Sequence, residues 1–215
     1  MEICKGSECL KVELIAYSLP RDGDVDKLVA ESGAISHAPH FKELNEERVK
    51  NLIALLQKLG HESVFEHACF TFRVEGISRV CTHQLVRHRL ASYTQQSQRY
   101  VKLKNVEFIV PDEIMDSEFR EEYVEFLKHA EKLYRKMVEG GIRKEDARFA
   151  LPQGVETKIV ITMNARELRH FFKLRCDKSA QWEIRNLALK MLEQVHKVAP
   201  ILFEDIYELY LPKNK

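Results

Sequence analysis

The stretch from Arg87 to Tyr100 holds the densest group of side chains that could do chemistry in this sequence. It reads Arg-His-Arg-Leu-Ala-Ser-Tyr-Thr-Gln-Gln-Ser-Gln-Arg-Tyr, with three arginines, one histidine, two serines and three glutamines around only two aliphatic residues. Guanidinium groups stay charged, and their forked N–H donors match the paired oxygens of phosphate or carboxylate. The stretch therefore predicts a binding site for a nucleotide or a diphosphate. A solvated polar loop is the alternative interpretation.

A second group of donors lies on the helix predicted at 165–175. Asn164 is a suitable N-cap for this helix, and Glu167 three residues later would complete a capping box. Arg166, His170 and Lys173 fall on one helix face, because they are separated by four and three residues. They could contact the same ligand as the first group, or they could form a solvated basic face.

The segment from Gly60 to His67 contains two histidines and two glutamates, which suggests a metal site. His61 and His67 are six residues apart, however, and a helical zinc pair needs a spacing of four. No third ligand lies nearby in the sequence. We therefore predict no metal, and the segment could either cap local structure or contact a ligand.

Composition restricts the class of protein. The chain has 215 residues, 34 basic and 33 acidic side chains, so no overall field attracts nucleic acid or an anionic membrane. No run approaches the roughly 18 apolar residues of a membrane span, and the amino terminus lacks the apolar core of a signal peptide. We expect a cytoplasmic protein. The five cysteines are scattered, and we expect reduced thiols that serve mainly in packing.

The hydrophobic periodicity predicts four strands and eight helices in one domain, residues 1–215. The predicted strands are 10–17, 69–75, 106–110 and 155–163, with Gly76 ending the second. The predicted helices are 24–30, 45–59, one that begins at 77 and runs into Arg87-His88-Arg89, 117–139, 143–151, 165–175, 179–198 and 200–210. The polar stretch therefore begins in the last turn of the third helix, where positive charge complements the helix dipole.

The polar stretch resembles the signature of the flavin-dependent thymidylate synthases, in which Arg-His-Arg is followed by seven residues and a serine. Here the triplet is Arg87-His88-Arg89 and the serine is Ser97. The match also includes Gly60-His61-Glu62-Ser63, Phe65-Glu66-His67, Arg148 before Leu151-Pro152, Asn164-Ala165-Arg166, Leu174-Arg175 and Ala180-Gln181-Trp182-Glu183-Ile184. A single Arg-His-Arg triplet is weak evidence for the family, but this ordered set of motifs is specific for it.

The resemblance implies a mixed α+β fold with a central, antiparallel-rich sheet flanked by helices. It also implies a homotetramer whose active sites form where subunits meet, with FAD bound there. The enzyme, a methyltransferase, would convert dUMP to dTMP, with 5,10-methylenetetrahydrofolate as carbon donor and FAD reduced by NADPH as hydride donor. No cysteine lies in the motif, so we expect no protein nucleophile on the pyrimidine, and the flavin would carry the hard chemistry.

The resemblance also implies site residues. Those expected to contact FAD are Ser36, His61, Ser63, Glu66, Arg87, His88, Arg89, Leu90, Asn164, Arg166, His170 and Leu174. Those expected to bind dUMP are Gln84, Arg87, Gln95, Gln96, Ser97, Gln98, Arg99, Arg148 and Arg175. We assign the catalytic role to Arg175, because a guanidinium beside the uracil can stabilise negative charge on N3 and the ring oxygens.

Three other functions were weighed against this one. Arginines beside Tyr93 and Tyr100 would suit a nucleic-acid-binding module, but the balanced charge and the lack of a broad basic stripe argue against it. A metal-dependent hydrolase could use several histidines, namely His61, His67, His83 and His88. An oligomerisation protein would explain the long amphipathic helix at 117–139 but would leave the arginines without a role.

Overall fold

The computed structural model describes residues 1–21, 23–36, 44–101 and 105–211. The chain divides into two compact units, each built from segments that are distant in sequence. Unit 1 contains Met1–Lys11, Val74–Arg87 and Tyr93–Val160, and unit 2 contains Val12–Arg73, His88–Ser92 and Ile161–Lys215. The expectation of one domain from 1 to 215 stays a prediction.

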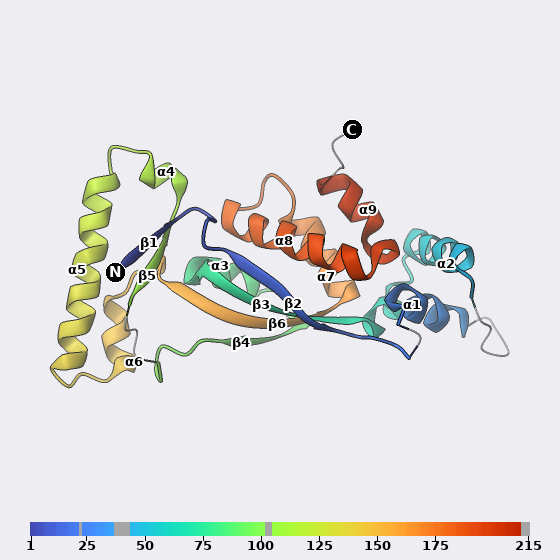
Figure 1. The fold of residues 1–215 in the computed structure, drawn as a ribbon, viewed down its shortest axis with the longest axis horizontal. Helices are drawn as coiled ribbons and strands as arrows, with labels where there is room; N and C mark the ends of the chain where they lie inside the picture. Colours follow the sequence, from blue (N-terminus) through green and yellow to red (C-terminus); the bar gives the residue numbers. More distant parts are fainter. Residues whose placement is uncertain (22, 37–43, 102–104, 212–215) are drawn as a thin grey trace. The chain divides into compact units, whose positions relative to one another are not determined.

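The described strands form two sheets, labelled in Figure 1. One has the order β2-β3-β6-β4, with bounds Lys11–Tyr17, Cys69–Ser78, Glu156–Asn164 and Ala91–Gln95. Thr71 lies opposite Thr162, and Glu75 pairs with Lys158, so β3 and β6 run antiparallel. The other sheet pairs β1 (Glu2–Lys5) with β5 (Glu107–Val110) in parallel. The mixed α and β class is confirmed, although a parallel pair accompanies the antiparallel sheet.

Strand β3 departs from its prediction, since Gly76 does not end it. Gly76 has a φ of +71°, which glycine adopts at little cost, and the strand continues to Ser78. A Cβ at this position would lie 2.0 Å from the carbonyl oxygen of Cys9. The glycine thus permits a close approach of two backbone segments in unit 1. Strands β1 and β4 were not predicted, and β4 lies inside the polar stretch.

Unit 1 is centred on β5 and the long helix α5 (Arg120–Glu139), which lie side by side in Figure 1. Phe108 from β5 and Leu127 and Tyr134 from α5 are fully buried in one cluster. The other helical segments are α3 (Arg79–Leu85), α4 (Asp112–Met115), α6 (Lys144–Ala147) and the 3₁₀ turn η2 (Arg148–Ala150). Helix α3 therefore ends before Arg87.

Unit 2 contains most of the helices that the periodicity predicted. They are α1 (Val25–Ala34), α2 (Glu46–Leu59), α7 (Ala165–Arg175), α8 (Trp182–Val198) and α9 (Pro200–Tyr210), with the 3₁₀ segment η1 (Glu62–His67). Asn164 caps α7 as predicted, because its side chain accepts the N–H of Glu167. The carboxylate of Glu167 lies against His88, not against the cap.

Helix α7 is fixed on its inner side by aromatic packing and by one ion pair of a buried arginine. The ring of Phe203 packs at 5.7 Å from Phe70 and 5.8 Å from Phe172. Arg169, only 8% exposed, donates two hydrogen bonds to Asp205 of α9, at 2.8 and 2.7 Å. These contacts hold one face of α7 inside unit 2, so its opposite face is presented for binding.

The expectation of five reduced cysteines is wrong for one pair. Cys4 and Cys9 form a disulfide within unit 1, because the turn between them brings their Cα atoms to 6.0 Å. Cys69, Cys81 and Cys176 are outside the disulfide, and the last two are buried. In the described residues no helix is long and apolar enough to cross a membrane.

Candidate functional site

The predicted site residues divide between the two units in a regular way. Every residue expected to contact FAD lies in unit 2, apart from Arg87. Every residue expected to bind dUMP lies in unit 1, apart from Arg175. Each unit therefore carries its own group of ligand-binding candidates.

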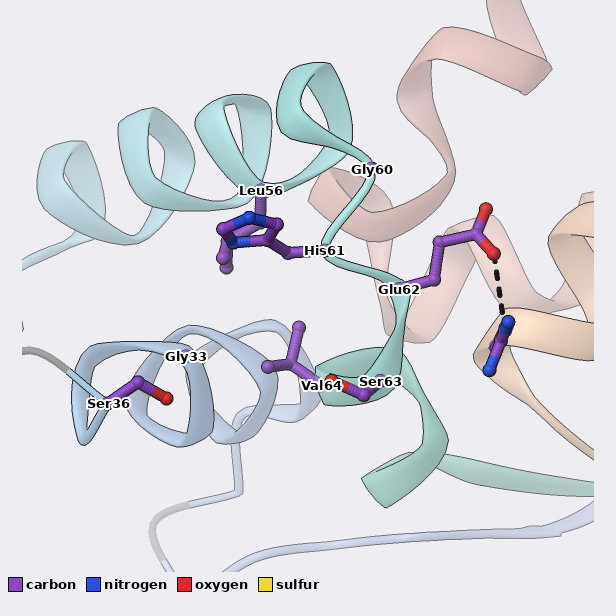
Figure 2. A pocket seen from close by; sticks show the side chains of 9 residues that line it. Gly33, Ser36, Leu56, Gly60, His61, Glu62, Ser63 and Val64 are labelled. Atoms are coloured by element: carbon purple, nitrogen blue, oxygen red, sulfur yellow. Dashed lines mark hydrogen bonds and ion pairs between the residues drawn. The ribbon is translucent and has the colours of Figure 1, made fainter.

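A cavity of about 440 Å³ lies in unit 2 where α1, α2 and η1 meet (Figure 2). Four of the residues expected to contact FAD line it, namely Ser36, His61, Ser63 and Arg166. Figure 2 shows the His61 ring between α1 and α2. Gly60 ends α2 with a φ of 70°, and this left-handed turn redirects the chain so that His61 and Ser63 follow directly at the cavity.

Arg166 joins α7 to η1 at the side of this cavity. Its Nη1 donates to Glu66 at 2.6 Å and its Nε donates to Glu62 at 3.2 Å. Glu66 and then Glu62 raise the pKa of Arg166, so the guanidinium stays charged. One cation thus faces two carboxylates, and the exposed carboxylate oxygens could accept hydrogen bonds from hydroxyl or amine groups of a nucleotide.

The exposed face of α7 continues from Arg166 through His170 to Leu174. Arg166 and His170 share one helix face as the sequence predicted, and Leu174 follows at the same spacing of four. The ring of His170 lies 5.9 Å from that of His88, which belongs to the polar stretch. The two groups of donors that are far apart in the sequence therefore meet within unit 2.

His88 is buried, with 5% exposure, whereas its neighbours Arg89 and Leu90 are exposed. Its Nδ1 lies 3.2 Å from Glu167 Oε1, and its Nε2 lies 3.1 Å from the Nε of Arg175. The edge of Phe171 packs against the ring at 4.9 Å. His88 thus connects the first polar stretch to the carboxyl end of α7.

Arg175 is held in place by the ends of the neighbouring helices. The carbonyl of Cys176, the next residue, accepts from the Nε of Arg185 in α8 at 3.1 Å. The hydroxyl of Tyr210 in α9 donates to the carbonyl of Lys173 at 3.2 Å. A cation in the last turn of α7 also interacts favourably with the helix dipole. The backbone that carries Arg175 is therefore well anchored.

We expect His88 to stay neutral down to about pH 4. Burial, then Arg175 and then His170, lower its pKa from 6.5 to about 4. Between these values the unfolded chain binds a proton that the folded chain does not, so folding stability decreases as the pH falls from 6.5 to 4. The full effect is on the order of 3 kcal/mol.

The measurement is the free energy of unfolding of the native protein minus that of a His88→Asn variant, followed from pH 7 to pH 4. This difference should decrease as the pH falls. Buried Asp26, whose pKa is raised to about 6 mainly by burial, acts in the opposite direction but is common to both proteins. A difference that does not change with pH would contradict the low pKa of His88.

The dUMP candidates of unit 1 lie around β4 and α3. Gln95 donates to the hydroxyls of Thr82 and Thr157, both at 3.2 Å, which fixes the end of β4. The remaining candidates comprise half-buried Gln84, Gln96, Ser97 and Arg148, buried Gln98, and exposed Arg87 and Arg99. Ser97 Oγ accepts the N–H of Arg99 at 3.3 Å, so these two residues belong to one turn.

Arg79 is a residue of this region that the sequence analysis missed. It is the first residue of α3, and its Nη1 is buried without a hydrogen-bond partner among the described residues. Burial and the nearby charge of Arg148 lower the pKa of Arg79. Two neighbouring guanidinium groups, one with an unused N–H, are suited to an anion. The sequence signal was a charged residue among the apolar positions Ile77, Val80 and Cys81.

Among the described residues, no group of three or more histidines, cysteines or carboxylates is arranged to hold a metal ion. Two of the four histidines considered for a hydrolase have surroundings that are not those of a metal ligand. His61 lines the cavity, and His88 interacts with Glu167 and Arg175.

The sequence model of the family described as Thymidylate synthase complementing protein matches residues 13–201. A flavin-dependent thymidylate synthase of Pyrococcus abyssi is 55% identical over 162 residues, which cover 73% of this chain and 66% of the relative. One of Clostridium tetani is 45% identical over 217 residues, covering 91% and 86%. The crystal structure of a UMP/dUMP methylase, PolB from Streptomyces cacaoi bound with 5-Br dUMP, has a TM-score of 0.84 at 24% identity and 98% coverage of both chains.

Proposed function

Because the chain belongs to the flavin-dependent thymidylate synthase family, we propose that it converts dUMP to dTMP. It is an FAD-dependent methyltransferase that uses 5,10-methylenetetrahydrofolate as carbon donor and NADPH as the source of reducing equivalents. The observation that carries the proposal is the convergence of three motif segments in unit 2. Segment 60–67 contacts α7 through Arg166, and segment 88–90 contacts it through His88 and Arg175.

The residues around the unit 2 cavity fit a flavin nucleotide. Ser36, Ser63 and His61 offer hydroxyl and imidazole groups. Glu66, which pairs with Arg166 of the lining, offers an acceptor for ribose hydroxyls or an adenine amine. Arg89 is exposed and can pair with a phosphate, while Leu90 and Leu174 supply exposed apolar surface for a ring. The remaining residues proposed to hold FAD are Arg87, His88, Asn164, Arg166 and His170. When bound, FAD supplies the hydride.

In unit 1 we propose that dUMP binds beside β4 and α3. Arg79 and Arg148 provide a cationic pair for its phosphate, together with Ser97 and Arg99. The amides of Gln84, Gln95, Gln96 and Gln98 offer donors and acceptors that suit a pyrimidine edge.

The proposed catalytic residue, Arg175, belongs to unit 2. Its guanidinium is suited to stabilise negative charge on a uracil, which increases electron density at the carbon that is methylated.

The two buried thiols, Cys81 and Cys176, are unsuited to act as a protein nucleophile. A nucleophilic cysteine must ionise, and the thiolate is favoured by nearby positive charge and exposure. Burial raises the pKa of Cys176 to about 12, and Cys81 is also buried. Their environment keeps these thiols away from a substrate, in agreement with a reaction in which protein groups bind and orient.

We also propose that the protein is a homotetramer with active sites at subunit interfaces. Three large apolar residues, spaced seven apart, are exposed at the start of α5 and along it: Phe119, the N-cap, by 62%, Phe126 by 50% and Leu133 by 43%. Such a row on one helix is suited to burial against another chain. A cytoplasmic location stays an expectation from the sequence.

The test of the proposed function is the visible absorption spectrum, followed by turnover. We expect FAD to co-elute with the protein in gel filtration, and its oxidised band to bleach with NADPH. Added dUMP and 5,10-methylenetetrahydrofolate should then give dTMP. A colourless protein that does not take up FAD, or a flavoprotein that leaves dUMP unchanged, would contradict the proposal.

A further inference from the structure

We propose that Glu167 is a positioning residue of this enzyme, which orients the guanidinium of Arg175 through the imidazole of His88. The inference rests on the proposed function for its catalytic consequence. Its structural basis, the line Glu167–His88–Arg175, lies entirely within unit 2 and is independent of that function.

The line is built from groups with little freedom to move. Glu167 is 5% exposed and His88 is 5% exposed. Glu167 lies in the first turn of α7, where Asn164 accepts its N–H at 2.9 Å, and Arg175 lies in the last turn of the same helix. His88 spans the space between these two turns, with Phe171 against its ring. One helix therefore supplies both ends of the line.

The direction of the hydrogen bonds fixes the tautomer of His88. The Nε of Arg175 carries a proton and can only donate, so Nε2 of His88 must present its lone pair. The proton of the neutral ring is then on Nδ1, which donates to Glu167 Oε1. The reverse tautomer would place two N–H groups opposite each other. Glu167 is the acceptor that stabilises the correct tautomer, as carboxylates do for histidines in other sites.

This arrangement determines which donors of Arg175 remain for a substrate. Its Nε–H is used by His88, which sets the plane of the guanidinium. Among the described residues, neither Nη group of Arg175 has a hydrogen-bond partner. The Nε bond to His88 therefore holds a pair of parallel N–H donors in a fixed direction. Such a fork suits the N3 and O2 or O4 positions of a uracil anion. Rigid donors stabilise developing charge better than donors that must reorganise.

Two substitutions of Glu167 by side chains of nearly equal size distinguish this positioning role from a general effect on stability. Glu167→Gln keeps an oxygen that can accept from Nδ1, whereas Glu167→Met removes it. We expect the Gln variant to retain near-native kcat. The Met variant should lose on the order of 10- to 100-fold in kcat, with FAD content unchanged. Wild-type kcat in the Met variant, or equal losses in both variants, would overturn the proposal.

A second measurement tests the line without any turnover. Nitrogen-15 NMR of histidine-labelled native protein should show His88 as the Nδ1–H tautomer, and the population of that tautomer should fall in Glu167→Met. A native protein with the proton on Nε2 would overturn the proposal even if Glu167→Met does not fold. If the native enzyme lacks dUMP turnover but shows the expected tautomer, the proposed function fails while the line itself stands.

Discussion

Arg175→Ala is expected to abolish most turnover while the protein remains folded and keeps its flavin. The guanidinium is the charged group that we assign to the uracil, and it lies at the carboxyl end of α7 with its Nε bonded to His88. Removing one preorganised donor to a developing anion typically lowers kcat by about 10²- to 10³-fold. The measurement is kcat for dTMP formation at saturating dUMP, together with flavin content and the unfolding temperature.

Two further variants give this experiment its control. Lys173→Ala removes an exposed cation two residues away on the same helix, and we expect it to leave kcat nearly unchanged. Arg175→Lys keeps the charge but cannot bond to His88 and fork toward a substrate at once, so it should fall between Arg175→Ala and the native enzyme. If Arg175→Ala turns over dUMP at the native rate, Arg175 is not the catalytic residue.

Gly76→Ala is expected to be the most destabilising of the single-methyl changes at the positive-φ glycines in the described residues. The residue has a φ of +71°, which costs a non-glycine about 1–2 kcal/mol. The new Cβ would also lie 2.0 Å from the backbone oxygen of Cys9, and backbone atoms cannot rotate away. We expect a total loss of about 3–5 kcal/mol in the free energy of unfolding.

Gly141→Ala is the matched control in the same unit. Gly141 also has a positive φ, +90°, but no atom lies within 4 Å of its added Cβ. The Gly141→Ala variant should lose only the cost of a positive φ in a non-glycine residue, about 1–2 kcal/mol in the free energy of unfolding. Urea unfolding of both variants measures the difference, which reports the close approach of β3 to Cys9. Equal losses at the two positions would show that this approach can relax.

Local sequence patterns were sufficient to predict most of the helices and strands. The periodic apolar residues of α2 and α5, the cap Asn164 and the stop at Gly60 all depend on neighbours within a few residues. Strand β6 and helix α7 were predicted within one residue of their bounds for the same reason. The signature residues also indicated the family, because their types and spacing can be read directly.

The predictions from the sequence were wrong mainly where contacts between distant parts of the chain decide the local structure. Gly76 lies within a strand and close to the backbone of Cys9, which is far away in the sequence. The Cys4–Cys9 disulfide is the exception, because only a short turn separates the two cysteines. Strand β4 forms within a polar stretch, where it takes its place beside β6. None of these partners can be identified from local hydrophobic periodicity.

The sequence by itself indicated the family, which the comparisons confirm, and most of the helices, whereas the residues assigned to the flavin and the nucleotide stay predictions. Only the tertiary structure decided that His88 is buried and neutral, that Glu167 faces it instead of its own helix cap, and that Arg79 has an unused N–H. His88 is 79 residues from Glu167 and 87 from Arg175 in the chain. Proton position and burial depend on which atoms surround a group, and at such separations the fold alone sets those neighbours.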